Sequence, residues 1–260
     1  MLYIYGTVFN NQGTLINSIE SLSKINIEKQ FLIVDNFSTD GTYELLEKIK
    51  GKYNIAIKRM KCSRGLGRQK AMEMVYDKAT NKDLFMRFDL DTTYTSRFVT
   101  LIEYGVKILN QKEILLNQLC FKQVNFAVKW EDLNNGDDWE RMANFLYSGY
   151  RVVNVRDNYY ELANNYIGDT REKRYANGIT YYKRIIKNQI DLFRGWNISS
   201  YKNLKQFMEA AEVKKSHFIP QILFLIYIKV FNHVYKYSDE INILYVKHKM
   251  EFIEIPFTEQ

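Results

Sequence analysis

Two acidic residues in the first half of the chain, Asp89 and Asp91, have the spacing of a metal-binding pair. They follow the apolar run 84–88, which is interrupted only by Arg87 and is typical of a short buried strand. Side chains two residues apart on an extended segment point the same way, so both carboxylates would lie together. Paired hard oxygen ligands suit Mg²⁺ or Mn²⁺, which water and substrate phosphates usually complete. The alternative interpretation is a solvated acidic turn.

The elements expected to position this pair alternate between strand and helix. Strands are predicted at residues 2–9, 31–34, 54–60 and 84–88, and helices at 14–22, 43–50 and 69–78, the first of them capped by Thr14. This alternation indicates βαβ units and a mostly parallel sheet flanked by helices, an α/β fold. Right-handed crossovers bring the carboxyl ends of such strands to one edge. Residues 7–11, Asp35, the 61–68 loop and the acidic pair would therefore line one crevice.

The pattern beyond residue 91 is looser. Helices are predicted at 97–109 and 138–148, strands at 114–121, 126–130 and 151–155, and mainly helical structure from about residue 170. The run 218–231 is strongly apolar but shorter than the roughly 20 residues of a membrane span. We expect it to form a buried or interfacial helix.

Composition places the chain among ordinary globular proteins. Of its 260 residues, 46% are hydrophobic and 26% charged, unlike a disordered chain. The two cysteines, Cys62 and Cys120, lie far apart, so a disulfide framework is not expected and a reducing, cytoplasmic location fits best. No N-terminal signal peptide is predicted.

The net charge of +7 is concentrated in residues 171–215, which hold eleven Lys and Arg against four Asp and Glu. A basic segment with interleaved aromatic residues can face a phosphate-bearing partner, an anionic membrane surface or nucleic acid. A solvated helical face is the alternative.

Five motifs in the first 156 residues, about 60% of the chain, resemble those of the family 2 nucleotide-sugar glycosyltransferases, which have the GT-A fold. They are Thr7-Val8-Phe9-Asn10 with residues 18–22, residues 34–42, residues 64–69, Asp89-Leu90-Asp91, and residues 136–153. Each motif alone is weak, but all five occur in the family's order. The chain departs from the family at Gly6, where Pro is usual, at the neighbours of Arg68, and at Asp137, where Glu is commoner.

The resemblance implies a role for each matching residue. Asp35 would bind the nucleobase, Thr7, Phe9 and Asn10 would contact the donor, and Arg68, with Arg64 and Lys70 as weaker candidates, would reach its phosphates. Asp89 would face the ribose or the metal, and Asp91 would ligate Mn²⁺ or Mg²⁺. Asp138 would remove the acceptor proton, with Asp137 and Asp132 as competitors. Asp35 could instead stabilise its own loop, and Asp137 and Asp138 could serve as helix N-terminal residues.

The function implied is metal-dependent, inverting transfer of a sugar from a UDP- or GDP-linked donor to an acceptor hydroxyl or a lipid phosphate. The acceptor would be a glycan, a protein or a lipid-linked molecule, and no nucleic acid partner is expected. The basic segment and the apolar run 218–231 motivate the separate hypothesis of peripheral contact at the inner membrane face or a lipid-linked phosphate acceptor. Residues 1–91 would bind the donor, 92–165 would carry the base and acceptor site, and 166–260 would form a basic helical region.

Two other functions remain open from the sequence. Gly65, Gly67 and Ala71 form a Gly-x-Gly-x-x-x-Ala pattern between a strand and a helix, which could indicate an NAD(P)-dependent oxidoreductase. The basic C-terminal third could instead make the protein a non-enzymatic binder of nucleic acid or an acidic polymer, although no DNA-binding motif is present.

Overall fold

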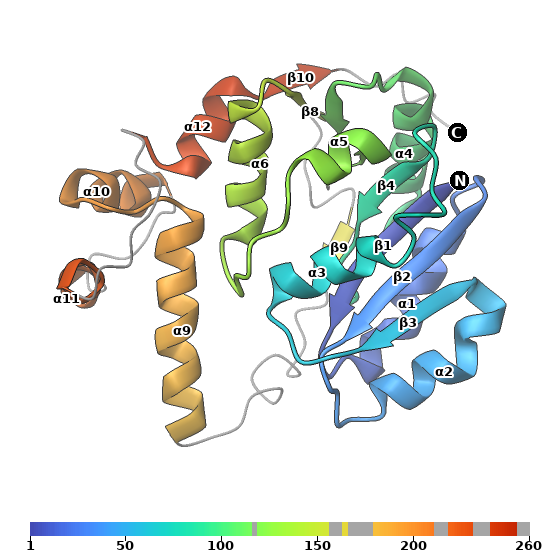
Figure 1. Ribbon diagram of the computed structural model, residues 1–260, viewed down its shortest axis with the longest axis horizontal. Helices are drawn as coiled ribbons and strands as arrows, with labels where there is room; N and C mark the ends of the chain where they lie inside the picture. Colours follow the sequence, from blue (N-terminus) through green and yellow to red (C-terminus); the bar gives the residue numbers. More distant parts are fainter. Residues whose placement is uncertain (116–118, 156–162, 166–178, 211–217, 231–239, 254–260) are drawn as a thin grey trace.

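A computed structural model describes residues 1–115, 119–155, 163–165, 179–210, 218–230 and 240–253 (Figure 1). Strands and helices alternate strictly at the start of the chain. The elements are β1 (Leu2–Val8), α1 (Gln12–Ser23), β2 (Lys29–Asp35), α2 (Thr42–Tyr53), β3 (Ile55–Arg59), α3 (Arg64–Glu73) and β4 (Leu84–Arg87). The predicted α/β order of strands and helices is confirmed for this half. The helix expected at 69–78 instead begins five residues earlier, at Arg64, because the Ser63 side chain caps it by accepting from the backbone N–H of Leu66.

The main sheet has the strand order β3-β2-β1-β4-β7. Its first four strands are parallel, and β7 (Cys120–Phe121) pairs with β4 in the antiparallel direction. Val8 of β1 is in register with Asp35 of β2, and Tyr5 with Arg87 of β4. The carboxyl ends of the four parallel strands therefore lie along one edge, as the sequence predicted.

Helices cover both faces of this sheet, because alternate side chains of each strand point in opposite directions. Leu2 and Ile4 of β1 face a core shared with α1, α2 and α4 (Ser96–Ile108). Tyr3 and Tyr5 face a second core shared with α3 and Trp130. In Figure 1, α3 lies in front of the sheet and α1 behind it.

The remaining described elements form smaller units beside the main sheet. β6 (Glu113–Leu115), β8 (Arg151–Val155) and β10 (Glu251–Ile253) make a parallel sheet, and β5 (Thr92–Tyr94) pairs with β9 (Ala163–Asn165). The helices are α5 (Lys122–Ala127), α6 (Asp137–Tyr147), α9 (Ile179–Gly195), α10 (Tyr201–Ala210), α11 (Phe218–Val230) and α12 (Asn242–Lys249). α9 to α12 pack around their own core, which includes Phe193, Leu204 and Phe207.

The C-terminal region returns to the first part of the chain, since α12 packs on α6 and β10 pairs with β8. The division at residues 91 and 165 remains a prediction. None of the helices described is long and apolar enough to cross a membrane. α11 is a helix, as expected for the run 218–231, of which residue 231 lies outside the described residues.

Three other local predictions were wrong. Residues 126–130 do not form a strand: α5 ends at Ala127, and buried Asn125 is held in place by Arg141 and Tyr5. The strand expected at 114–121 is split between β6 and β7, which belong to different sheets. Thr14 is not the cap of α1, whose N-cap is Asn11. The Thr14 hydroxyl instead donates to the Leu90 carbonyl at 3.0 Å, which connects α1 to the segment after β4.

Candidate active site

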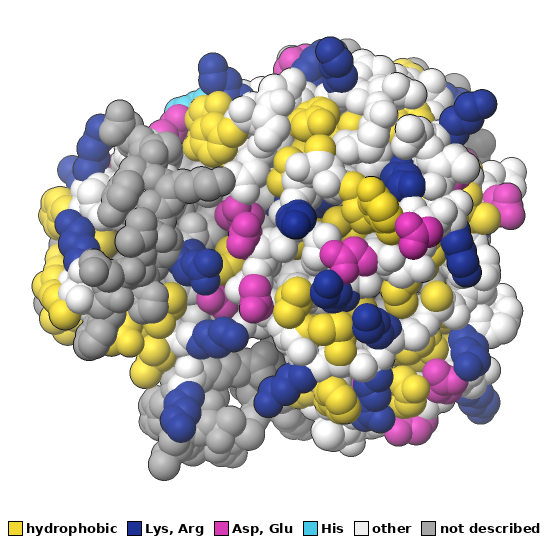
Figure 2. All heavy atoms as spheres, viewed as in Figure 1, with side chains coloured by type: hydrophobic (Ala, Val, Ile, Leu, Met, Phe, Trp, Pro, Cys, Tyr) yellow, Lys and Arg dark blue, Asp and Glu magenta, His cyan; other side chains and the backbone are white. Residues whose placement is uncertain are grey.

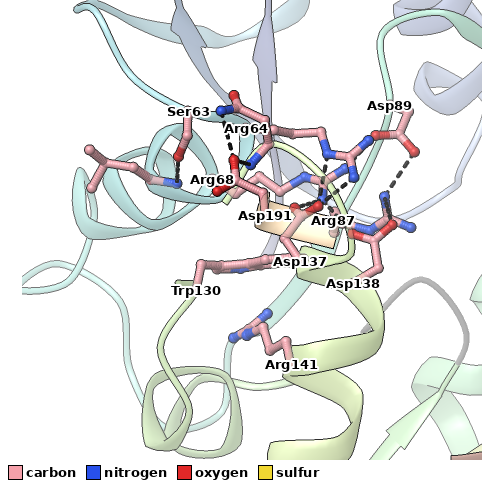
Figure 3. A network of polar contacts seen from close by, with 12 residues as sticks. Ser63, Arg64, Arg68, Arg87, Asp89, Trp130, Asp137, Asp138, Arg141 and Asp191 are labelled. Carbon is pink, nitrogen blue, oxygen red and sulfur yellow. Dashed lines mark hydrogen bonds and ion pairs between the residues drawn. The ribbon is translucent and has the colours of Figure 1, made fainter. Parts of the chain in front are cut away.

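Three arginines and three aspartates meet at the carboxyl edge of the main sheet (Figure 3). They come from three elements far apart in sequence, and we call them the charge cluster. Its members are Arg64 and Arg68 of α3, Arg87 and Asp89 at the end of β4, and Asp137 and Asp138 at the start of α6.

Arg68 is the centre of the cluster, and its side chain is only 1% exposed. Its Nη1 donates to Oδ2 of Asp137 and to Oδ1 of Asp138, both at 2.5 Å. Its Nη2 donates to Oδ1 of Asp89 at 2.7 Å. A single guanidinium group therefore joins the end of β4 to the first turn of α6.

Asp137 is fully buried and also accepts hydrogen bonds from Arg64, one of them from Nε at 2.9 Å. The chain enters α6 through Gly136, whose φ of +74° is the left-handed conformation that glycine tolerates best. An acid in the first helical turn is also favoured by the helix dipole. The position of Asp137 suits holding two arginines in place more than reaching a substrate.

Asp138 is the more accessible acid, with a side chain 34% exposed. Besides Arg68 it faces Arg87, whose Nη1 lies 3.6 Å from Oδ2. Burial by itself raises the pKa of Asp138, but Arg68, Arg87 and Arg64 outweigh it and hold the pKa well below its usual value. Asp138 is therefore a carboxylate at neutral pH.

Asp89 is held in the same way. Its Oδ1 accepts from Arg68 and its Oδ2 from Arg87 at 2.8 Å. Burial opposes ionisation, yet Arg87 and Arg68 lower the pKa of Asp89 below its usual value. The two arginines thus occupy both oxygens of the first acid of the Asp-x-Asp pair.

The expected metal site fits the two acids unequally. Both oxygens of Asp89 already accept from arginine, and two nearby guanidinium groups repel a cation. Asp91 is a partly exposed carboxylate just beyond β4 and offers the hard oxygen that Mg²⁺ and Mn²⁺ prefer. Within the described part of the chain, no three His, Cys, Asp or Glu residues are grouped so as to hold a metal. Asp91 is the better candidate ligand of the pair.

The other predicted donor residues lie in the loops after β1 and β2. Thr7 donates to the Val34 carbonyl at 3.0 Å, and Asn10 accepts from the backbone N–H of Thr39 at 2.9 Å. Buried Asp35 accepts from the backbone N–H of Ser38 at 3.1 Å and pairs with Arg59 at 3.2 Å. The two loops are thus fixed to each other, and Asp35 stabilises its own loop whatever else it binds. Phe9 beside them is partly exposed.

These loops adjoin the start of α3. A Cβ atom on Gly67 would lie 2.5 Å from Oγ1 of Thr7, so the glycine allows α3 to approach the end of β1. The start of α3 therefore packs directly on the end of β1. Lys70, a weaker candidate for the phosphates, pairs with Glu73 at 2.7 Å on the same helix. Asp132 is exposed in the loop before α6 and is not a member of the charge cluster.

Sequence reasoning missed Arg87 and Arg141. The signal for Arg87 was its position as the one charge in a buried strand, two residues before Asp89. Arg141 is fully buried below the cluster, where Trp130 lies between it and Arg68 in Figure 3. It donates to the Tyr5 hydroxyl at 2.8 Å and to the Val128 carbonyl at 3.1 Å. It therefore supports the ring on which Arg68 rests.

Comparison with known proteins identifies the architecture. Residues 4–104 match the family model described as glycosyl transferase family 2. The match spans 101 residues, about two fifths of the chain. The match includes β1 to β4 and the segments that carry Asp35, Arg68 and Asp89. The resemblance recognised in the sequence is confirmed, and with it the glycosyltransferase class.

Solved structures share the fold at low identity. The S. aureus TarS fragment 1–349 is 12% identical, has a TM-score of 0.53, and matches over 86% of this chain and 78% of its own. The same fragment in complex with UDP-GlcNAc matches with the same identity and TM-score over 86% and 79%. The mannosyltransferase PcManGT from Pyrobaculum calidifontis, in complex with GDP-Man and Mn²⁺, is 12% identical, with a TM-score of 0.50 over 87% and 69%. The predicted GT-A fold is confirmed. A comparison with curated proteins found no match.

The oxidoreductase alternative loses its main support. A Cβ atom on Gly65 would lie 2.0 Å from the Glu131 carbonyl oxygen, and the Gly65 N–H donates to the Leu133 carbonyl at 2.9 Å. Gly65 serves the packing of α3 on the loop before α6, and Gly67 serves its packing on β1. Both glycines are explained by contacts within the protein and need no dinucleotide.

Proposed function

We propose that this protein transfers a sugar from a UDP- or GDP-linked donor to an acceptor hydroxyl or lipid phosphate, with inversion at the anomeric carbon. The observation that carries the proposal is the placement of Arg68. Its guanidinium group joins Asp89, at the tip of the donor-binding strand, to Asp138, at the start of the acceptor-side helix. A fixed cation at this point, beside the candidate base, would stabilise the negative charge that develops on a departing diphosphate.

The donor would lie along the edge formed by the β1 and β2 loops. Asp35 would receive the nucleobase, and Thr7, Phe9 and Asn10 would contact the nucleoside. Two findings support this placement: these residues fall within the family match, and structures of similar fold hold UDP-GlcNAc or GDP-Man. Uracil-linked and guanine-linked donors are both candidates, with any of several sugars.

The diphosphate leaving group would be neutralised by the arginines of the charge cluster. Preorganised cations aimed at developing negative charge are among the strongest contributions to catalysis. Arg64 is the most accessible of the three, with a side chain 40% exposed, and Arg68 is the most firmly held. Mn²⁺ or Mg²⁺, with Asp91 as its protein ligand, would add Lewis-acid stabilisation of the same diphosphate.

Asp138 would be the general base. It is ionised, partly exposed, and at the start of α6 on the side facing β4. As the acceptor hydroxyl attacks the anomeric carbon from the face opposite the diphosphate, its proton would pass to the Asp138 carboxylate. Asp137 is fully buried between Arg64 and Arg68, which makes it the positioning partner of the pair.

The acceptor would bind on the side of α6 and the C-terminal helices, and a glycan, a protein and a lipid-linked molecule all remain candidates. Trp139 packs against the C-terminal core and offers one wall of this side.

A thermal-shift panel tests the proposal. The protein would be heated with UDP-glucose, UDP-GlcNAc, GDP-mannose and NADH, each with and without Mn²⁺. A ligand that binds the folded state raises the melting temperature. We expect a nucleotide sugar to raise it and NADH to leave it unchanged. A shift with NADH alone, or with none of the nucleotide sugars, would contradict the proposal.

A further inference from the structure

α11 is an apolar helix with two different faces. Leu225 is buried, and Ile222 and Phe224 pack on the C-terminal core beside Phe193. The opposite side carries four exposed apolar side chains, which we call the α11 stripe: Leu223, Ile226, Tyr227 and Val230, with exposures of 62%, 53%, 39% and 69%.

The four positions follow helical geometry. Their spacing of i, i+3, i+4 and i+7 places them in one continuous band along the helix. Single exposed apolar residues are common and need no explanation, but a contiguous band marks an interaction surface. Within the described part of the chain, the core contacts occupy the other face of α11, so packing among those residues does not account for the stripe.

The exposed side chains of the C-terminal helices are strongly basic. Six exposed cations lie on α9, α10 and α11: Lys183, Lys187, Arg194, Lys202, Lys205 and Lys229. Among the described residues of the same helices, Glu209 is the exposed acid, while Asp191 is buried. In Figure 2, dark blue and yellow side chains lie side by side at the left edge, where Figure 1 places α10 and α11. Tyr201 and Ile186 add exposed apolar area to α10 and α9.

We propose that the α11 stripe docks on the surface of an anionic lipid bilayer. The combination of an apolar band with flanking lysines matches both parts of that surface, the acyl boundary and the acidic headgroups. A second copy of the chain would bring two basic surfaces together, which electrostatic repulsion opposes. A nucleic acid would use the lysines and leave the apolar band in water.

The length of α11 fits contact without crossing. Thirteen residues at a rise of about 1.5 Å per residue span roughly 20 Å. The hydrocarbon core of a bilayer is about 30 Å thick. α11 would therefore lie in the plane of the interface, with Lys229 directed to the headgroups.

The docking surface is joined through α9 to the loop that precedes α6. Gln189 of α9 donates to Gln221 of α11 at 2.5 Å. Two residues further along α9, Asp191 accepts from the backbone N–H of Asn134 at 2.9 Å, in the loop that leads into α6. Membrane docking does not depend on the proposed activity. If the protein is a glycosyltransferase as proposed, docking would favour a lipid-linked acceptor over the other candidates.

Co-sedimentation with vesicles tests the docking surface. The protein would be mixed with vesicles of phosphatidylcholine alone and with vesicles that also contain phosphatidylglycerol. We expect binding to the anionic vesicles that weakens as salt is added, since screening reduces the attraction of exposed charges. Absence of binding to anionic vesicles at low salt would overturn the proposal.

Matched variants separate the stripe from nonspecific effects. The double variant Ile226→Ser and Val230→Ser should lower vesicle affinity about tenfold or more, because it removes apolar area from the interface. Ile108→Ser, on the exposed face of α4, should leave it unchanged. Lys205→Gln should weaken binding and Lys52→Gln should not, although both lysines are about equally exposed, at 66% and 68%, beside one glutamate.

Two further outcomes would show that the α11 stripe binds a different partner. A dimer in solution that the Ile226→Ser and Val230→Ser variant dissociates would make the stripe an interface between copies of the chain. Binding of an oligonucleotide that competes with the vesicles and ignores the serine variant would make the surface a nucleic acid site. Either result contradicts membrane docking.

Discussion

Arg68 and Asp137 form an ion pair between two side chains that are both buried, with Nη1 and Oδ2 2.5 Å apart. The pair joins α3 to α6, which are 69 residues apart at these positions. Removing one member of a buried pair leaves the other charge without compensation, which costs far more than losing an exposed pair. The pair is therefore part of the fold as well as of the candidate site.

Replacement of Arg68 by methionine should destabilise the protein by about 3–5 kcal/mol, as is typical when one partner of a buried pair is lost. Urea unfolding at pH 7 measures this. Arg151→Met is the control, because Arg151 is exposed and pairs with Glu113 and Glu251 at the surface, where such pairs contribute about 1 kcal/mol or less. Equal losses in the two variants would mean that the cluster does not hold α3 and α6 together.

Alanine substitutions at Gly65 and at Gly51 should change the stability of the protein in opposite directions. A Cβ atom on Gly65 would overlap the Glu131 carbonyl oxygen, so Gly65→Ala should destabilise by about 1–3 kcal/mol. Gly51 lies inside α2 with open space around its Cα, and Gly51→Ala should stabilise by about 0.5–1 kcal/mol. Thermal unfolding of both variants checks the contact. A neutral Gly65→Ala would show that α3 does not pack on the loop before α6.

The stability of the protein should fall with acidification. Because the pKa values of Asp89 and Asp138 are lower in the folded state than their usual value, the unfolded state binds more protons in acid. Their contribution is complete above a pH of about 4, the ordinary pKa of aspartate, and is lost as the pH falls through the folded values. Urea unfolding between pH 7 and pH 3 should show this loss.

Asp138→Asn should remove part of that pH dependence, whereas Asp132→Asn, at an exposed side chain, should preserve it. Identical pH profiles for the wild type and Asp138→Asn would mean that the arginines do not perturb Asp138.

Cys62 should react slowly with alkylating reagents. Burial raises the pKa of its thiol to about 11, and that of Cys120 to about 12, so the reactive thiolate is scarce at pH 8. Iodoacetamide should modify the folded protein roughly a hundredfold more slowly than the protein in urea, where a thiol has an ordinary pKa of about 8.5. Equally fast labelling of the folded chain would show an accessible thiolate.

The strands of the donor half could be predicted from the sequence because each is determined by its own run of residues. Each strand from β1 to β4 is an apolar run of its own, and Asp35 and Asp89 follow two of them directly. The order of parallel strands then brought their ends together without further assumptions. The family motifs added Asp138, on a helix whose start the sequence located within one residue.

The sequence could not predict which charges would pair. Arg87 faces Asp138 from 51 positions earlier in the chain. Its position in a buried strand indicated that it would pair, but not that Asp138 would be one of its partners. Residues 126–130 were misassigned for a related reason. Asn125 is stabilised in α5 by hydrogen bonds to Tyr5 and Arg141, and these long-range contacts outweighed the β-type pattern of its neighbours.

The most direct test of the proposed activity compares wild type with Asp138→Asn in two assays on the same preparation, donor binding by calorimetry and release of nucleoside diphosphate. We predict that Asp138→Asn binds the donor found in the thermal-shift panel with an affinity within a few-fold of wild type. Turnover should fall by about two to four orders of magnitude, the usual contribution of a general base. Retained turnover in Asp138→Asn would contradict the assignment of Asp138 as the base and the mechanism built on it.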